Sequence, residues 1–406
     1  MGCDICEKCE FVQVIKGEHI PEKTHSLLPI TNLFFGLTEN CNFRCRYCFV
    51  HQHPKDMTYD IAKQGIDWMM RQSNKKCNVY YFGGEPTLKW HDIIVPLTTY
   101  AKETYGDRIT FGITTNGYLL NEDELKFMQR YDISMHFSFD GCKNCMDYNR
   151  PTKDGASSFD VLVDKIPMFL KYHPNVTMRA TLDNDTVKYF YESHKFAIEQ
   201  GFKNTFFAIN TFADWTQEQF KILEQQLYKV ADLFIQEIKR GKVYYFNPLL
   251  KQFSNIIANK NNETRDKRRN LMGYGKCGIG ANGSAVLSTE GNIYTCQEVY
   301  TNYEQRDHFY IGNIFDGIND DLRKNIFAQF KPYKSRRSDG KSCDTCNLKN
   351  ICGGGCLIRN YTHYEDMNIV PASMCEHDSM TYDVAMYIMN ELKDNKLFND
   401  TFMRGR

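Results

Sequence analysis

The sequence predicts an α/β fold: a partial barrel of six βα units followed by a small cysteine-rich region. Between residues 31 and 240, six runs rich in β-branched and aromatic residues alternate with amphipathic helical stretches. From Cys277 onward the pattern changes to short strands, glycines and cysteines with little apolar material. The 406 residues are 42% hydrophobic and 25% charged, which is enough for a large core and for two or three domains.

Each strand is expected to be followed by a helix on the outside of the sheet. The expected strands are Asn32–Leu37, Val79–Phe82, Ile109–Thr114, Ile133–Phe139, Val176–Leu182 and Thr205–Ile209. The expected helices are Thr58–Arg71, His91–Thr104, Glu122–Arg130, Phe159–Tyr172, Thr186–Gln200 and Gln217–Arg240. Such a series favours a parallel sheet, which right-handed crossovers curl into a full or partial barrel with functional groups at the carboxyl ends of its strands.

Five segments follow from this pattern. We expect an N-terminal extension over residues 1–30, the barrel over 31–240, a linker over 241–276, a cysteine-rich domain over 277–376 and a C-terminal segment over 377–406. The linker is polar over Asn259–Asn270, and the last segment contains an amphipathic helix at about Ser379–Lys393. The cysteine-rich domain cannot bury much core, so we expect bound metal to hold it together.

Charge and hydropathy exclude several classes of function. The 50 basic and 50 acidic side chains cancel, so no general attraction to nucleic acid or to an anionic membrane is expected. No apolar run reaches the roughly 18 residues of a transmembrane helix, and the polar N-terminus MGCDICEKCE is not a secretory signal. A cytoplasmic location is therefore expected, where structural disulfides are rare.

The 16 cysteines are the unusual feature of the composition. Buried structural thiols would be scattered, but here only Cys77 stands alone and the others cluster. Clustering in a reducing compartment favours metal binding, either to zinc or to an iron–sulfur cluster. The groups are Cys3, Cys6, Cys9; Cys41, Cys45, Cys48; Cys142, Cys145; Cys277, Cys296; and Cys343, Cys346, Cys352, Cys356 with Cys375.

The second group directly follows the first expected strand. Its thiolates, separated by three and two residues, can hold three irons of a 4Fe–4S cluster and leave the fourth open. A zinc site closed by one further ligand is the alternative. With an aromatic residue at Tyr47, this spacing resembles the signature of radical S-adenosylmethionine (SAM) enzymes.

Further motifs support this resemblance in the expected order. Gly83-Gly84-Glu85-Pro86 resembles the GGEP motif of the family and ends the second strand. Thr114–Gly117 ends the third strand, and Ser138–Gly141 ends the fourth and precedes Asp147–Arg150. Arg179 lies in the fifth strand.

The resemblance implies a role for each of these residues. Cys41, Cys45 and Cys48 would hold the cluster that binds and cleaves SAM. Gly83, Gly84 and Glu85 would meet the methionine ammonium, because a carboxylate and carbonyl groups accept hydrogen bonds from a cation. The remaining candidates for SAM contacts are Tyr47 near the adenine, and Asn116, Ser138, Arg150 and Arg179.

The C-terminal cysteines resemble the SPASM domain, an extension with two auxiliary 4Fe–4S clusters. Seven cysteines and Gly291 match its spacing, whereas a zinc ribbon would explain only four of the cysteines. The resemblance implies two ligand sets. The first cluster would take Cys277, Cys296 and Cys356, and the second would take Cys343, Cys346, Cys352 and Cys375.

The first auxiliary cluster is expected to have an open iron. Some relatives add a fourth ligand six residues after the first cysteine, and that position is Gly283 here. A substrate thiolate is the obvious outside ligand. Sulfatase-maturating relatives also carry an Asp, taken as the catalytic base, where this chain has Gln297, and Gln cannot act as a base. Glu298 is the tentative alternative, as a proton acceptor or as a structural carboxylate.

These features favour a maturase that forms thioether bonds in a cysteine-containing precursor peptide. Formylglycine formation or another side-chain oxidation is the alternative within the class, and a non-catalytic iron–sulfur redox carrier is the alternative of another class. SAM, three 4Fe–4S clusters, the peptide and an electron donor such as flavodoxin or ferredoxin are the expected cofactors and partners. Only about 30 residues precede the first strand, so we expect the leader of the peptide to be bound either by a separate leader-binding protein or by a shorter element.

Overall fold

The computed structural model describes residues 27–260, 283–329, 334–335 and 354–403, together with Ser342, Cys343, Thr345, Cys346, Leu348 and Cys352. Predictions for Cys3, Cys6, Cys9 and Cys277, and for residues 261–276 of the linker, lie outside these residues. None of the described helices is both long and apolar enough to cross a bilayer.

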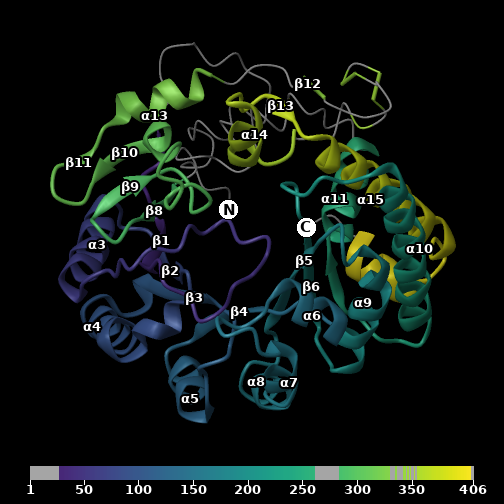
Figure 1. Cartoon of the computed structure of the whole chain (residues 1–406), viewed down its shortest axis with the longest axis horizontal. Helices are drawn as coiled ribbons and strands as arrows, with labels where there is room; N and C mark the ends of the chain where they lie inside the picture. Colours follow the sequence, from purple (N-terminus) through teal and green to yellow (C-terminus); the bar gives the residue numbers. More distant parts are fainter. Residues whose placement is uncertain are drawn as a thin grey trace, which may run out of the picture.

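A curved parallel sheet forms the first half of the chain, as predicted. Its strands pair in sequence order, each parallel to the next (Figure 1). They are β1 (Asn32–Thr38), β2 (Cys77–Gly83), β3 (Ile109–Thr115), β4 (Ile133–Ser138), β5 (Thr177–Leu182) and β6 (Asn204–Ile209). The fold class, a partial (β/α)6 barrel, is therefore confirmed.

Helices cover the outer face of this sheet (Figure 1). They are α3 (Tyr59–Gln72), α4 (Val95–Tyr105), α5 (Glu122–Arg130), α6 (Lys143–Asn149), α7 (Ser158–Val163), α8 (Ile166–Tyr172), α9 (Phe190–Glu199) and α10 (Gln217–Lys239). The single helix expected over Phe159–Tyr172 is two helices, because Pro167 lies at the start of α8 and cannot continue a helix from α7. Short helical segments accompany them: η1 (Pro86–Lys89), η2 (Trp90–Ile94), η3 (Gly106–Arg108) and η4 (Val187–Tyr189).

The cysteine-rich region extends the same sheet past β1. Strand β8 (Ser284–Leu287) pairs with β1 in parallel, and β9 (Asn292–Tyr294), β10 (Tyr310–Asn313) and β11 (Gly317–Ile318) continue antiparallel. At the other edge β7 (Tyr245–Asn247) pairs with β6. The described sheet thus has eleven strands in the order β11-β10-β9-β8-β1-β2-β3-β4-β5-β6-β7.

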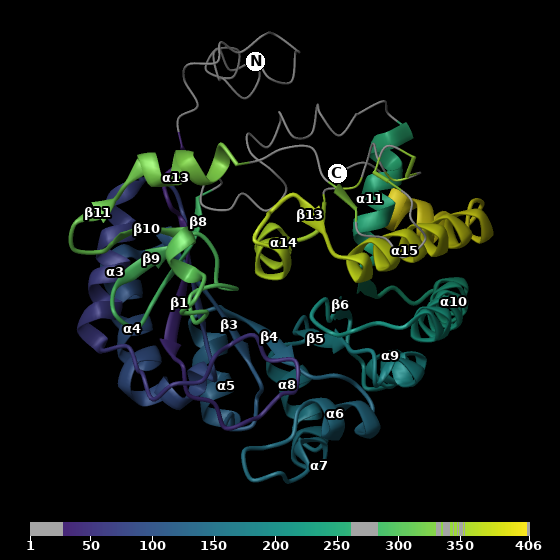
Figure 2. The ribbon, with the colours of Figure 1, turned by 45° about the horizontal axis from the view of Figure 1, so that its top comes forward.

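Most of the remaining elements, which lie outside the large sheet, are on the side of the barrel opposite α5, α7 and α8 (Figure 2). The remaining elements are α11 (Leu249–Lys260), η5 (Arg306–Phe309), α13 (Asp320–Phe327), β12 (Lys334–Ser335), α14 (Leu357–Tyr364), β13 (Ile369–Val370), α15 (Ala372–Glu391), α16 (Lys396–Phe398) and η6 (Asn399–Met403). Helix α15, which begins near Cys375, packs on α10 and α11. Lys251 of α11 pairs with Asp378 of α15 at 2.8 Å.

The two faces of the parallel strands differ. Outward-facing residues such as Phe35, Tyr81 and Phe137 are fully buried under the helices. Inward-facing residues such as Tyr80 and His136 stay partly exposed. The inside of the barrel is therefore hollow near the carboxyl ends of the strands, where the site lies.

Candidate active site

A cavity of about 280 Å³ lies over the carboxyl ends of the parallel strands. It is near the lower end of the size range of small-molecule sites. Twelve of the residues predicted from sequence line it. They are Cys41, Cys45, Tyr47, Cys48, Gly83, Gly84, Glu85, Asn116, Ser138, Arg150, Arg179 and Glu298.

The loop after β1 brings three cysteines to this cavity. It is pinned across the barrel opening by hydrogen bonds from Arg44 N to Pro151 O (2.8 Å) and from Arg46 N to Asn149 O (2.9 Å). Burial raises the pKa of Cys41 to about 12, and the nearby Glu85 carboxylate adds to this shift. Burial also raises the pKa of Cys45 to about 12. Both thiols therefore keep their protons at neutral pH until a metal replaces them.

Four of the predicted cluster cysteines share one local conformation. A backbone N–H two residues further along the chain donates to the sulfur of Cys41 (3.3 Å), Cys296 (3.5 Å), Cys346 (3.4 Å) and Cys352 (3.3 Å). Hydrogen bonds to sulfur stabilise thiolate ligands and tune iron–sulfur clusters. Among the described residues no three His, Cys, Asp or Glu side chains converge on a single-ion site. The described donors are cysteine sulfurs, which suit an iron–sulfur cluster or zinc.

Glu85 is buried at the centre of the cavity wall. Its Oε1 accepts from Thr87 N (3.1 Å), Thr87 Oγ1 (2.6 Å) and Thr115 Oγ1 (2.7 Å), and its Oε2 accepts from Asn116 N (2.8 Å). Burial raises the pKa of Glu85, against the hydrogen bonds that lower it. Because Oε2 has a single partner among the described residues, it has a lone pair available for a cation in the cavity.

The glycines before Glu85 allow the loop and the strand to meet. A Cβ on Gly84 would lie 2.1 Å from the carbonyl oxygen of Asn40. The amide of Glu85 donates to that same oxygen at 2.9 Å. Gly84 therefore allows β2 to approach the backbone of the loop that contains the three cysteines.

Asp140 organises the opposite wall. It is 2% exposed, and it accepts from Tyr47 Oη (2.5 Å), Asn149 Nδ2 (3.0 Å), Arg150 Nε (3.0 Å) and Thr181 N (2.9 Å). Asp140 thus fixes two of the predicted SAM residues, Tyr47 and Arg150. The charge of Arg150 is already balanced by Asp140.

Arg179 contributes a second kind of group. Its guanidinium lies over the Phe206 ring at 4.8 Å and has no hydrogen-bond acceptor among the residues that the structure describes. Burial lowers its pKa, although not enough to deprotonate an arginine. The cavity therefore presents a carboxylate at Glu85 and a guanidinium at Arg179. This pair is complementary to the ammonium and carboxylate groups of an amino acid such as the methionine part of SAM.

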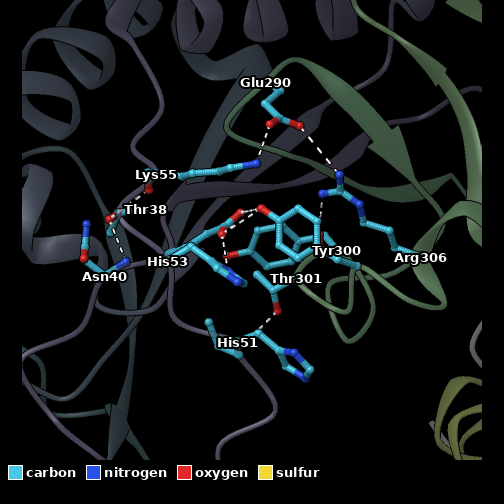
Figure 3. A network of polar contacts seen from close by, with 12 residues as sticks. Thr38, Asn40, His51, His53, Lys55, Glu290, Tyr300, Thr301 and Arg306 are labelled. Carbon is cyan, nitrogen blue, oxygen red and sulfur yellow. Dashed lines mark hydrogen bonds and ion pairs between the residues drawn. The ribbon is translucent and has the colours of Figure 1, made fainter.

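The loop that contains Glu39 is clamped to the segment after Cys296 (Figure 3). Glu39 is 1% exposed. The donating hydroxyl of Tyr303 lies 2.9 Å from each of its carboxylate oxygens, and His53 Nδ1 lies 3.0 Å from Oε2. Lys55 pairs with Glu290 at 2.7 Å, and His51 N donates to Thr301 Oγ1 at 3.2 Å. One segment, residues 296–306, thus holds the cysteine loop and also supplies Gln297 and Glu298 to the cavity.

Gly283 occupies a position that no other residue can easily take. Its φ is +84°, and a Cβ there would lie 2.7 Å from the carbonyl oxygen of Pro29. Its own carbonyl accepts from Thr31 N (2.8 Å) and Asn32 N (2.9 Å), which starts β1 beside β8. Replacement by a ligating side chain would therefore strain this junction.

Cys142 and Cys145 lie outside the cavity lining and form a buried pair. Ser193 Oγ donates to both sulfurs, at 3.3 and 3.2 Å. A hydrogen bond from Cys145 lowers the pKa of Cys142 to about 7, and the same interaction raises the pKa of Cys145. The metal binding expected for this pair from its clustering in the sequence stays untested.

Comparison with known proteins identifies the domain that builds this cavity. The sequence model of the Radical SAM superfamily matches residues 36–221, which include the cysteine loop and every predicted SAM residue. This chain contains a radical SAM domain.

Sequence relatives cover more than that domain. A cysteine-type anaerobic sulfatase-maturating enzyme of Clostridium novyi is 23% identical over 79% of this chain and 85% of its own length. The radical SAM cyclopropyl synthase TigE of Paramaledivibacter caminithermalis is 23% identical over 84% of this chain and 70% of its own length.

Two solved structures share the fold of the radical SAM domain and its extension. Native anSMEcpe with bound AdoMet and Cp18Cys peptide aligns with a TM-score of 0.71 at 19% identity, over 90% of this chain and 99% of that one. Streptococcus suis SuiB bound to precursor peptide SuiA aligns with a TM-score of 0.58 at 16% identity, over 90% of this chain and 79% of that one.

Several residues of the cavity were not found from the sequence. They are Gln52, Tyr80, His136, Asn210, Phe212 and Arg359. Tyr80 and His136 could have been found from the alternation of their strands. His136 lies two residues before the predicted Ser138, and Tyr80 shares the inward face of β2 with Phe82. Burial lowers the pKa of His136 to about 4, so its imidazole is neutral in the cavity at pH 7. Arg359 has no such signal, since it reaches the site from α14.

Proposed function

We propose that this chain is a radical SAM maturase that joins a cysteine sulfur of a peptide substrate to a carbon of the same peptide. Peptide substrates are suggested by the solved relatives, whose structures contain the Cp18Cys peptide and the precursor peptide SuiA. The observation that supports the thioether assignment is Gly283, whose φ of +84° and tight surroundings disfavour a ligating side chain at that position.

Cys41, Cys45 and Cys48 would hold the 4Fe–4S cluster of the radical SAM domain. With SAM bound, the cluster held there would supply radical chemistry, through a 5′-deoxyadenosyl radical able to take a hydrogen atom from the substrate. Glu85 would bind the ammonium of SAM, and Arg179 its carboxylate. Arg150 and Tyr47, both fixed by Asp140, would form the wall beside the nucleoside.

Forming a thioether removes two hydrogens from the peptide. One leaves as the hydrogen atom that the radical takes, and the other as the thiol proton together with one electron. Cys296 and Cys356, with Cys277, would hold an auxiliary cluster as the electron acceptor. The second auxiliary cluster would take Cys343, Cys346, Cys352 and Cys375, and Cys375 is anchored to the barrel through α15.

Formylglycine formation is the second candidate function. The curated relatives favour it, because several of them are anaerobic sulfatase-maturating enzymes. Gln297, which lines the cavity where those enzymes are expected to carry an acidic base, argues against it. A redox carrier without catalysis would need no cavity with paired sites for an ammonium and a carboxylate.

Mass spectrometry of a co-expressed peptide tests the proposal. The peptide to test is any short cysteine-rich one found to be encoded beside the gene, and the Cp18Cys peptide is the comparison substrate. We expect the neighbouring peptide to lose two hydrogens per bridge and its cysteine to resist alkylation. Loss of the cysteine sulfur with formation of an aldehyde would establish the formylglycine reaction instead, and SAM cleavage with no change in peptide mass would refute both.

A further inference from the structure

An ion pair between Glu298 and Arg359 lines the cavity on the side of the auxiliary cysteines. Glu298 lies two residues after Cys296, and Arg359 lies three residues after Cys356 in the first turn of α14. Both side chains line the same cavity as the SAM residues. The pair therefore stands between the radical SAM site and the region of the first auxiliary cluster.

The geometry of the pair assigns different roles to its members. Arg359 Nε donates to one oxygen of Glu298 at 3.1 Å, and Nη2 donates to the other oxygen at 3.3 Å. The two side chains are only 17% and 11% exposed. Because Arg359 engages both carboxylate oxygens, Glu298 is held as a partner of the guanidinium and is poorly arranged to take a proton.

Arg359 retains hydrogen-bonding capacity toward the cavity. Its Nη1 donates to the carbonyl of Ile209 at 3.3 Å, so three of its five N–H groups have acceptors in the described part of the chain. Its charge is already balanced by Glu298. Such a guanidinium suits a neutral acceptor, such as a peptide carbonyl, better than an anion.

The ring of Phe212 lies next to Arg359 at the cavity and is partly exposed to solvent. Arg359 lies 5.8 Å from the centre of the Phe212 ring, which is 41% exposed. Phe212 stacks on His363 at 4.8 Å, one turn beyond Arg359 on α14. A chain that leaves the cavity at this point would pass a guanidinium and then an apolar ring.

We propose that Arg359 binds a main-chain carbonyl of the substrate peptide next to the reacting residue, and that Glu298 is a positioning residue which orients Arg359. Phe212 packs against the neighbouring part of the peptide. This inference rests on the proposed action on a peptide, and it replaces the role of Glu298 as a base.

Steady-state kinetics of the reconstituted enzyme tests this assignment. The variants are Arg359→Gln, Glu298→Gln and the double variant, and the control is Arg71→Gln, an exposed arginine at the end of α3. The probes are the Cp18Cys peptide and the peptide encoded beside the gene. Formation of 5′-deoxyadenosine and of modified peptide are followed together across pH.

We expect each single variant to raise the half-saturating peptide concentration about tenfold, with a smaller change in maximal rate and an unchanged pH profile. The double variant should be no worse than the singles, since the pair acts as a unit. It also leaves no uncompensated buried charge, so it serves as the test if a single variant fails to fold. Arg71→Gln should match the wild type.

Two results would overturn the assignment. One is an Arg359→Gln or double variant whose half-saturating peptide concentration stays within twofold of wild type. The other is a Glu298→Gln variant that keeps normal peptide affinity, cleaves SAM without modifying peptide and loses one limb of the pH profile, as a base would. If neither peptide stimulates the wild-type enzyme, the proposed function itself fails, and this inference fails with it.

Discussion

Replacing Gly283 by alanine should destabilise the protein more than the same change at a glycine with nearly the same φ. Gly283 and Gly241 have φ values of +84° and +83°, so each alanine variant carries the cost of a left-handed residue, about 1–2 kcal/mol. A Cβ at Gly241 meets nothing within 4 Å, whereas a Cβ at Gly283 lies 2.7 Å from the carbonyl oxygen of Pro29. The contact adds overpacking strain, typically about 1–3 kcal/mol.

Urea unfolding of the reconstituted protein, followed by tryptophan and tyrosine fluorescence, measures this difference. The expected free-energy difference between the two variants is the overpacking strain alone, since the backbone cost cancels. Equal unfolding midpoints for Gly283→Ala and Gly241→Ala would show that position 283 accepts a side chain. That result would refute the reasoning that this position cannot supply a fourth cluster ligand.

Three further predictions concern the site and its surroundings. Tyr303→Phe removes the hydroxyl that donates to the buried Glu39, which should lower the free energy of unfolding by about 1.5–3 kcal/mol. The variant should also lose iron to a chelator faster than the wild type. An unchanged rate of iron loss would contradict the proposed clamp between the two segments. Arg179→Met should weaken SAM binding at least about tenfold in equilibrium dialysis, because a charge-assisted hydrogen bond is worth about 1.5–3 kcal/mol. The control variant Arg71→Met should bind SAM as the wild type does. Because the pKa of Cys142 is lowered to about 7, the folded protein should become more stable as the pH rises from about 7 to 9. This contribution is lost as the pH falls through about 7. Cys142→Ser should remove the dependence of the urea midpoint on pH in this range.

The barrel and its motifs could be predicted because their signals are local. Strands such as Ile109–Thr115 alternate buried and inward-facing residues, and each motif directly follows its strand. Pro167 was overlooked, although its position in the chain is enough to divide α7 from α8.

What could not be predicted depends on contacts between distant segments. The pairing of β8 with β1 and the contact of Glu39 with Tyr303 join residues about 250 positions apart. Arg359 likewise reaches the cavity from α14, and no local pattern marks it. The close packing of Gly84 against the backbone of Asn40 likewise joins two separate segments, and the expected contact of Gly84 with SAM stays a prediction.

Transfer of deuterium from peptide to cofactor tests the central claim most directly. The peptide that is modified in co-expression is prepared with deuterium at its carbon positions and incubated anaerobically with reconstituted enzyme, SAM and a reductant. We predict 5′-deoxyadenosine that carries deuterium, and none from a variant in which Cys41, Cys45 and Cys48 are replaced by alanine. Formation of 5′-deoxyadenosine without deuterium, or none at all with the wild-type enzyme, would contradict the claim that this chain uses SAM to take hydrogen from a peptide.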